Sequence, residues 1–313
     1  MILSKKWVHL SIIIPSIILL VSIFLLIWTD TYSVLHPENT SFTDEPNRNF
    51  IKVEYILAHP KKYNGFIFGS SRVSALLPSH VKGANFYNMT YSEGIPHEHL
   101  LNLRLFIKHG VKIKKLLLGL DDFSYQVSFA KHQQQWLTKA HPLATETSWF
   151  SFYKFYFFHL LTQQDKRQFI KKIVAHDNLI DWDIIGQEKF YQTFFYNGSN
   201  FCDDDPKYLK PTHYSGNTKL ETLEDIKNIV TLCKQHHIEL TVFINPIHHT
   251  TYQDTNKQLL EEFKSSLAKI THYYDFSGPN TTTQNNHNFI DTSHYTITVG
   301  DQILNRMNLY KNK

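Results

Sequence analysis

The sequence predicts an α/β protein with a parallel sheet and helices on both faces of that sheet. Two short apolar runs that end in glycine, Gly65–Gly69 (GFIFG) and Lys115–Gly119 (KLLLG), are typical of strands buried on both sides. Longer stretches between such runs carry apolar residues at helical spacing. Because strand and helix alternate along most of the chain, parallel strands joined by crossover helices are favoured.

The first half of this pattern contains three strands and one helix. Gly65–Gly69 and Asn85–Met89 are predicted strands, and Pro96–His109 is a helix that ends before Gly110. Lys115–Gly119 is the third strand. Polar residues follow all three strands, and the carboxyl ends of parallel strands meet at one edge of a sheet. The sequence therefore predicts a polar site at that edge.

The second half of the pattern adds two strands and three helices. The predicted strands are Ile238–Ile244 and Tyr273–Phe276, and the predicted helices are Leu220–His237, Lys257–Ile270 and Thr298–Tyr310. The last of these closes the domain.

The N-terminus is predicted to anchor the chain in a membrane. Trp7–Trp28 contains no Asp, Glu, Lys or Arg and would cover about 33 Å as a helix, enough for a bilayer core. Tryptophans at both ends suit the membrane interfaces. Lys5 and Lys6 precede the run and Asp30 follows it, which places the N-terminus in the cytoplasm. A cleaved signal peptide is disfavoured, because the run is long and no small-residue cleavage site follows it.

We therefore expect a single-pass membrane protein whose main domain is periplasmic or extracellular. Residues 1–29 would form a cytoplasmic stub and transmembrane anchor, residues 30–50 a polar linker, and residues 51–313 the α/β domain. An aromatic-rich insertion at about 124–215 interrupts the strand–helix alternation. It is interpreted as a satellite core, with an amphipathic helix, a subdomain over the site or a membrane-surface contact as alternatives.

Composition excludes several classes of protein. With 42% hydrophobic and 19% charged residues among 313, the chain can bury a core and is not globally disordered. A net charge of +4 without a basic stripe argues against nucleic acid as a partner. The two cysteines, Cys202 and Cys233, do not make a disulfide scaffold, and the sequence leaves open whether they pair.

Two short motifs carry the chemistry, and they lie about 220 residues apart. Ser71 follows the first strand in Gly69-Ser-Ser-Arg, where a serine hydroxyl is exposed in a turn. His294 could act as its general base, and Asp291, three residues earlier, could orient the imidazole. The simpler alternatives are a helix cap for Ser70 or Ser71 and a surface loop for His294.

Together these motifs resemble the SGNH/GDSL hydrolase superfamily. The resemblance covers roughly residues 60–125 and 220–310 and rests on Gly69-Ser-Ser, Gly119-Leu-Asp-Asp and Asp291-x-x-His294, with Asn88 to Gly94 as a loose second block. It implies a flavodoxin-like sheet, with Ser71 as nucleophile and Asp291 and His294 completing a triad. Within the superfamily, the Ser-Arg form and the N-terminal anchor look like membrane-tethered members that act on cell-envelope polymers, such as relatives of teichoic acid D-alanylation and alginate O-acetylation proteins.

The resemblance also implies where an oxyanion hole would lie. The backbone N–H of Ser71 is one donor, and Gly94 or the segment before it supplies the second, with Asn88 in the same block. The family asparagine of the third block falls on Asp121, which as a carboxylate has no proton to donate. Arg72 is expected either to bring positive charge to this pocket or to lie on the surface.

The expected function is that of an extracytoplasmic serine esterase or O-acyltransferase acting on a cell-surface glycan or glycolipid. A polytopic acyl-donating membrane protein is a candidate partner, and no metal or other cofactor is required. The alternative is a non-catalytic glycan-binding or assembly subunit, which Asp121 and the loose second block favour.

Overall fold

A computed structural model describes residues 2–30, 32–37, 47–162, 188–189, 210–211 and 213–311. Its centre is a five-stranded sheet in the order β2-β1-β3-β4-β5, in which all neighbouring strands are parallel. This is the strand order of flavodoxin-like sheets. The strands are β1 (Gly65–Phe68), β2 (Phe86–Asn88), β3 (Lys115–Leu120), β4 (Glu239–Ile244) and β5 (Tyr273–Asp275). The predicted α/β class and all five predicted strands are confirmed.

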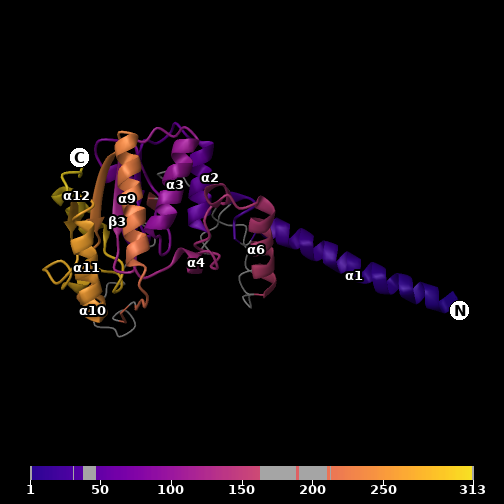
Figure 1. Ribbon diagram of the computed structural model, residues 1–313. Helices are drawn as coiled ribbons and strands as arrows, with labels where there is room; N and C mark the ends of the chain where they lie inside the picture. The colour runs from indigo at the N-terminus through magenta and orange to yellow at the C-terminus, as the bar shows by residue number, and fades with distance from the viewer. Residues whose placement is uncertain are drawn as a thin grey trace.

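Helices cover both faces of the sheet (Figure 1). One face packs against α3 (Pro96–Lys108), α9 (Lys219–Gln235) and α11 (Lys257–Leu267), through strand residues such as Phe66, Leu118 and Ile244. The other face packs against α12 (Ile297–Arg306) and the short 3₁₀ helix η2 (Ser71–Ala75), through residues such as Ile67, Leu117 and Phe243. Alternate strand residues thus enter opposite halves of the core, as the pleat of a strand requires.

The predicted helices agree with α3, α9, α11 and α12 to within a few residues. Six further helices of the described residues connect these elements. Four are α-helices, namely α2 (Arg48–Ala58), α4 (Phe129–His132), α5 (Pro142–Thr145) and α10 (His249–Asp254), and two are the 3₁₀ helices η3 (Pro78–His80) and η4 (Asn286–Asn288).

The segment predicted as a linker takes part in the fold at both of its ends. Tyr32 and Val34 are buried, and α2 begins at Arg48 with the Asn47 side chain accepting a hydrogen bond from the Phe50 N–H, 3.0 Å away. Tyr32 packs on aromatic rings more than 100 residues further along the chain. The composition of residues 30–50 gives no sign of partners so far away in the chain, which is why the sequence alone predicts a linker.

The helix α1 (Ile2–Thr29) projects from the domain as a single rod (Figure 1). Many of its apolar side chains are about half exposed or more, among them Leu20 at 65%, Phe24 at 64% and Trp28 at 52%. Within the part of the chain that the structure describes, no helix combines the length and the apolarity that crossing a membrane demands.

The aromatic-rich insertion contributes α4, α5 and α6 (Trp149–Thr162) to the described structure. Phe152 and Tyr156 of α6 are buried in the core that α12 also enters. The described part of the insertion thus packs into the main core of the domain and not into a satellite core of its own. Residues 163–187, 190–209 and 212 of the insertion, including Cys202, lie outside the described residues. Cys233 is a buried free thiol in α9.

Candidate active site

Ser71 stands at the carboxyl end of β1, where the chain leaves the sheet. Gly69 allows this turn, because a Cβ added there would lie 2.7 Å from a Val73 methyl. The Ser70 side chain accepts a hydrogen bond from the Arg72 N–H, 3.2 Å away, and so caps η2. The capping role proposed for the serine pair therefore falls on buried Ser70. Ser71 keeps a partly exposed side chain.

His294 is held by the turn that contains Asp291. One carboxylate oxygen of Asp291 accepts the backbone N–H groups of Ser293 and His294, both at 2.7 Å. The same carboxylate lies 2.9 Å from Nδ1 of the His294 ring. On the other side of the ring, Nε2 is 2.8 Å from the Ser71 Oγ. The structure thus brings the three predicted triad residues together in one hydrogen-bonded chain.

The environment of Asp291 favours its charged form. Burial alone would raise its pKa, but the hydrogen bond and charge interaction with His294 and the two backbone N–H donors lower the pKa to about 2. Asp291 is therefore ionised at any pH near neutrality. An ionised carboxylate at Nδ1 holds a proton there and leaves Nε2 to accept the serine proton.

Arg72 is buried under the site, and the surface alternative for this residue is wrong. Its guanidinium donates to Asp121 Oδ1 at 3.2 Å, to Asp122 Oδ1 at short range, and through Nε to the Ser293 Oγ at 3.1 Å. It also lies 5.2 Å from the centre of the Phe123 ring. Burial would lower the Arg72 pKa, but the two carboxylates outweigh burial and raise it. Arg72 therefore joins the serine motif to the histidine motif as a permanent cation.

Asp121 faces Arg72 and not an open cleft. Its Oδ1 accepts from Arg72 and, at 3.0 Å, from the Asn245 side-chain amide. Burial raises the Asp121 pKa, while attraction to Arg72 and a hydrogen bond from Ser70 act in the opposite direction. Asn245 in turn accepts from the buried Tyr295 hydroxyl at 2.8 Å. Asp121 is thus fixed within a buried polar network that ends beside His294.

Asn88 supports the segment that follows Ser71. Its amide donates to the Val73 and Leu76 carbonyls at 2.8 and 3.1 Å, and its oxygen accepts from the Thr90 N–H at 2.9 Å. Since both amide hydrogens are used within the fold, Asn88 has no donor left for a substrate. Its place in the structure is that of a brace for η2.

Gly94 lies against Gly69, at the turn that leads to Ser71. A Cβ at this position would come within 2.8 Å of the Gly69 carbonyl oxygen, so the close approach depends on glycine. A parallel bridge pairs Ser70 with Tyr91, so the loop that leads to Gly94 runs beside the turn of Ser71. Two backbone donors near the Ser71 hydroxyl are what an oxyanion hole requires.

A second buried ionic cluster supports the loop that contains Gly94. His132 lies 3.1 Å from Glu98 and 3.6 Å from Glu93, and Glu98 accepts a hydrogen bond from the Tyr91 hydroxyl at 2.6 Å. Burial would lower the His132 pKa, but hydrogen bonds and attraction to Glu93 and Glu98 raise it to about 9. The loop between β2 and α3 is therefore held by charge as well as by packing.

Three residues of the site were not singled out by sequence reasoning. Ser293 and Tyr295 flank His294, and Asn245 follows β4. Their position after a strand or beside a motif residue is the one signal the sequence offers. Their partners, Arg72 and Asp121, come from distant parts of the chain.

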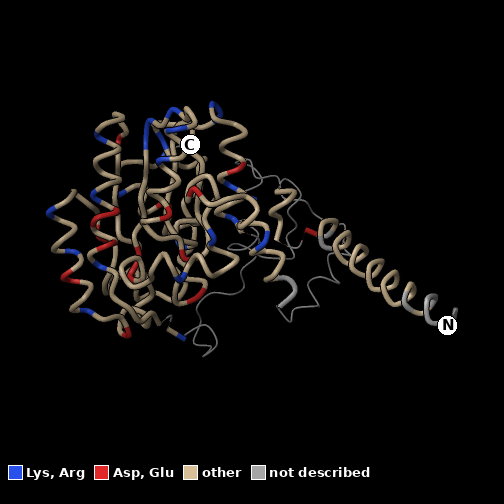
Figure 2. The backbone as a smooth tube through the Cα atoms, turned by 45° about the vertical axis from the view of Figure 1, so that its right-hand side comes forward, with Lys and Arg blue, Asp and Glu red and all other residues tan. Residues whose placement is uncertain are grey.

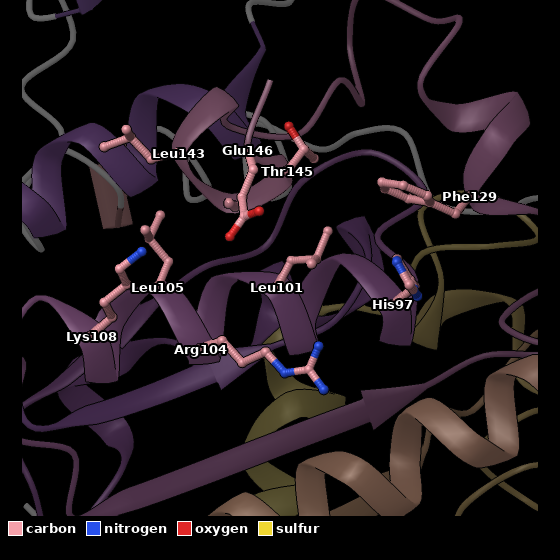
Figure 3. Close-up of a pocket in the computed structure, with 10 residues that line it drawn as sticks. His97, Leu101, Arg104, Leu105, Lys108, Phe129, Leu143, Thr145 and Glu146 are labelled. Carbon is pink, nitrogen blue, oxygen red and sulfur yellow. The ribbon is translucent and has the colours of Figure 1, made fainter. Parts of the chain in front are cut away.

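A separate surface hollow of about 400 Å³ lies over α3, away from this site (Figure 3). Its walls mix apolar residues such as Leu101 and Leu105 with charged residues such as Arg104 and Glu146. None of the residues that line it is a predicted site residue. Among the described residues, no three His, Cys, Asp or Glu side chains are grouped so as to hold a metal ion.

Comparison with known proteins does not place the chain in a family. No family model matches the sequence, and no curated protein matches it.

Proposed function

We propose that the protein is a serine-dependent esterase or O-acyltransferase of the SGNH type. The observation that carries the proposal is the chain of contacts from Ser71 Oγ to His294 Nε2, at 2.8 Å, and from His294 Nδ1 to Asp291, at 2.9 Å. These distances are within the range that proton transfer between the groups requires. A capping serine and a surface histidine would have no reason to meet in this geometry.

In the proposed reaction, the Ser71 Oγ attacks the carbonyl carbon of an acyl ester while His294 Nε2 takes the serine proton. The carbonyl oxygen becomes an oxyanion, for which the N–H groups of Ser71 and Gly94 are the donors. The carbonyl re-forms as the alcohol leaves with the proton from His294, and the acyl group stays on Ser71. Water or a sugar hydroxyl then attacks the carbonyl carbon of this ester while His294 Nε2 takes its proton. The bond from the acyl carbon to the Ser71 Oγ breaks, and His294 returns that proton to the Ser71 Oγ.

The substrate class in this proposal is an acylated glycan or glycolipid of the cell envelope. It is supported by the resemblance of the motifs to envelope-acting SGNH proteins and by the apolar N-terminal helix. The exposed apolar side chains of α1 support attachment to a membrane, since such a helix lowers its free energy by leaving water. A single span with a cytoplasmic N-terminus and an acyl-donating membrane partner stay predictions.

Hydrolysis of a short-chain aryl ester such as p-nitrophenyl acetate tests the proposal. We expect Ser71→Ala to abolish turnover and Ser79→Ala to retain it, because Ser79 is an exposed serine eight residues further on that contacts no triad residue. Adding a polyol or oligosaccharide acceptor to the wild-type reaction separates transfer from hydrolysis, since transfer yields an acylated sugar. Equal rates for wild type and Ser71→Ala would refute the proposal.

One observation favours a second function, that of a non-catalytic glycan-binding or assembly subunit. Asp121 takes the place of the asparagine donor in the resembling family, and its Oδ1 is occupied by Arg72 and Asn245. Losing one oxyanion donor typically costs about 10²–10³ in rate. Two results together would establish this function. Wild type and Ser71→Ala would bind envelope glycans with the same affinity, and the folded wild-type protein would hydrolyse no ester between pH 5 and 9.

A further inference from the structure

The helix α6 has two unlike faces, and the outer one is unusual for a protein surface. Phe152 and Tyr156 point into the core, where they are 1% and 4% exposed. Phe150, Phe157 and Phe158 are exposed by 75%, 36% and 52%. At 3.6 residues per turn, Phe150 and Phe157 lie opposite the buried pair, with Lys154 between them. A cluster of exposed aromatic rings on one helix face usually marks an interaction site.

The junction with α1 fixes where this face lies. Tyr32, just after α1, packs on the rings of Trp136 and Tyr156 at 4.8 and 5.5 Å. The Tyr156 hydroxyl donates to the Trp136 carbonyl at 2.7 Å, so the joint is hydrogen-bonded as well as packed. Figures 1 and 2 both show α6 at the end of the domain from which α1 projects. In Figure 2, every residue of α1 that is not drawn in grey is tan, so none of these residues is acidic or basic.

We propose that the outer face of α6 lies in the headgroup region of a lipid bilayer, next to the point where α1 enters it. The proposal goes beyond the serine chemistry and rests on the membrane attachment proposed for α1. It follows from continuity: the exposed Trp28 and Phe24 of α1 and the phenylalanines of α6 lie at the same end of the molecule. One bilayer can cover both apolar surfaces.

The chemistry of the outer face suits a bilayer interface. Phenylalanine is typical of the apolar face of helices that lie in a bilayer interface, where the ring is removed from water at the boundary of headgroups and acyl chains. Lys154 lies 5.8 Å from the centre of the Phe158 ring, so its stem covers apolar surface while its ammonium group can reach lipid phosphates. With two contacts, α1 and α6, the domain has a fixed orientation on the membrane and not only a tether.

Spin-label accessibility in nanodiscs tests this placement on the full chain. Single cysteines replace Lys154 in α6, Ile17 in α1 and Leu220 in α9, in a background with Cys202→Ser and Cys233→Ala. Leu220 is the matched control, because it is an apolar residue that is 76% exposed on a helix away from α1. Nitroxides at each position report collisions with oxygen, which concentrates in lipid, and with a water-soluble nickel chelate.

We expect the label at position 154 to be shielded from nickel and open to oxygen, like the label at 17 and unlike the label at 220. Changing Phe150, Phe157 and Phe158 to serine should return position 154 to water while position 17 stays in lipid. If the label at 154 were as accessible to nickel as the label at 220 while the label at 17 stayed shielded, the placement of α6 would be refuted and membrane attachment through α1 would stand. Nickel access at both 154 and 17 would refute membrane attachment too. Shielding at 154 from both probes would mean that protein covers α6, which also overturns it. None of these results depends on ester turnover, so this test is independent of the proposed enzyme activity.

Discussion

Replacing Arg72 with methionine should destabilise the protein strongly, because it leaves two carboxylates buried without their cation. The side chains of Arg72, Asp121 and Asp122 are exposed by 1%, 0% and 6%. Removing one partner of such a buried ion pair typically costs about 3–5 kcal/mol, whereas replacing the whole group by uncharged residues is often nearly neutral. The Arg72→Met variant should therefore lose about 3–5 kcal/mol of unfolding free energy near neutral pH.

The loss should depend on pH in a defined direction. Burial raises the Asp121 pKa and Arg72 opposes that rise, so without Arg72 the pKa rises further. The folded variant then binds a proton at a pH where the unfolded chain does not, which means that its stability falls as pH rises through this pKa. Relative to wild type, Arg72→Met should be least stable at pH 7.5 and should recover as pH falls toward the ordinary carboxyl pKa of about 3.9.

Urea unfolding of the detergent-solubilised chain, followed by tryptophan fluorescence at pH 7.5 and 5.5, measures both effects. The control combines Arg72→Met with Asp121→Asn and Asp122→Asn, and we expect it to recover most of the lost stability at pH 7.5 and to lose the pH dependence. A loss below about 1 kcal/mol in the single variant, the level of an exposed ion pair, would refute the reasoning. So would a triple variant no more stable than the single one.

Three other changes test the site and its supports. Asp291→Asn should lower ester turnover by up to about 10⁴-fold, because an amide does not stabilise the imidazolium, and stopped-flow or steady-state hydrolysis would measure it. Gly94→Ala should lower kcat by about 10²–10³-fold and also lower stability, since the new methyl group must push the loop away from Gly69 and its N–H away from the oxyanion. His132→Gln should cost more stability at pH 6 than at pH 10. The pKa of His132 is raised to about 9, so the charged histidine contributes stability that is complete below about pH 6.5 and is lost as pH rises through 9. Urea unfolding at the two pH values would measure the difference.

Each of these expectations can fail separately. Unchanged turnover in Asp291→Asn would remove the acid from the triad. A Gly94→Ala protein with full activity would exclude its N–H as an oxyanion donor. A stability loss in His132→Gln that is independent of pH would show that the residue acts by packing and not by charge.

The sheet and the triad could be predicted from sequence because their signals are local. Gly65–Phe68 and Glu239–Ile244 are apolar runs of strand length, and the Asp291-x-x-His294 spacing brings a carboxylate to an imidazole within one turn. Parallel topology then places Ser71 at the sheet edge to which the histidine loop returns. Each of these inferences needs only neighbouring residues and the general rules of α/β proteins.

The supports of the site could not be predicted, because they depend on partners far apart in the chain. Arg72 is an arginine in a polar turn, a setting in which most arginines are exposed, and its carboxylate partners lie about 50 residues away. Asn88 was taken for a residue of the pocket, yet it braces η2 from the neighbouring strand. In both cases the tertiary contact, and not the local pattern, decides whether a polar side chain faces solvent or the interior.

The most direct test of the account is the site of covalent modification by a fluorophosphonate. Peptide mapping by mass spectrometry after labelling the full chain should find the phosphonyl group on Ser71, and labelling should disappear in Ser71→Ala and fall sharply in His294→Asn. Labelling should persist in Ser79→Ala. A folded wild-type protein that takes up no probe between pH 5 and 9, or that takes it up on another residue, would contradict the claim that Ser71 is the nucleophile.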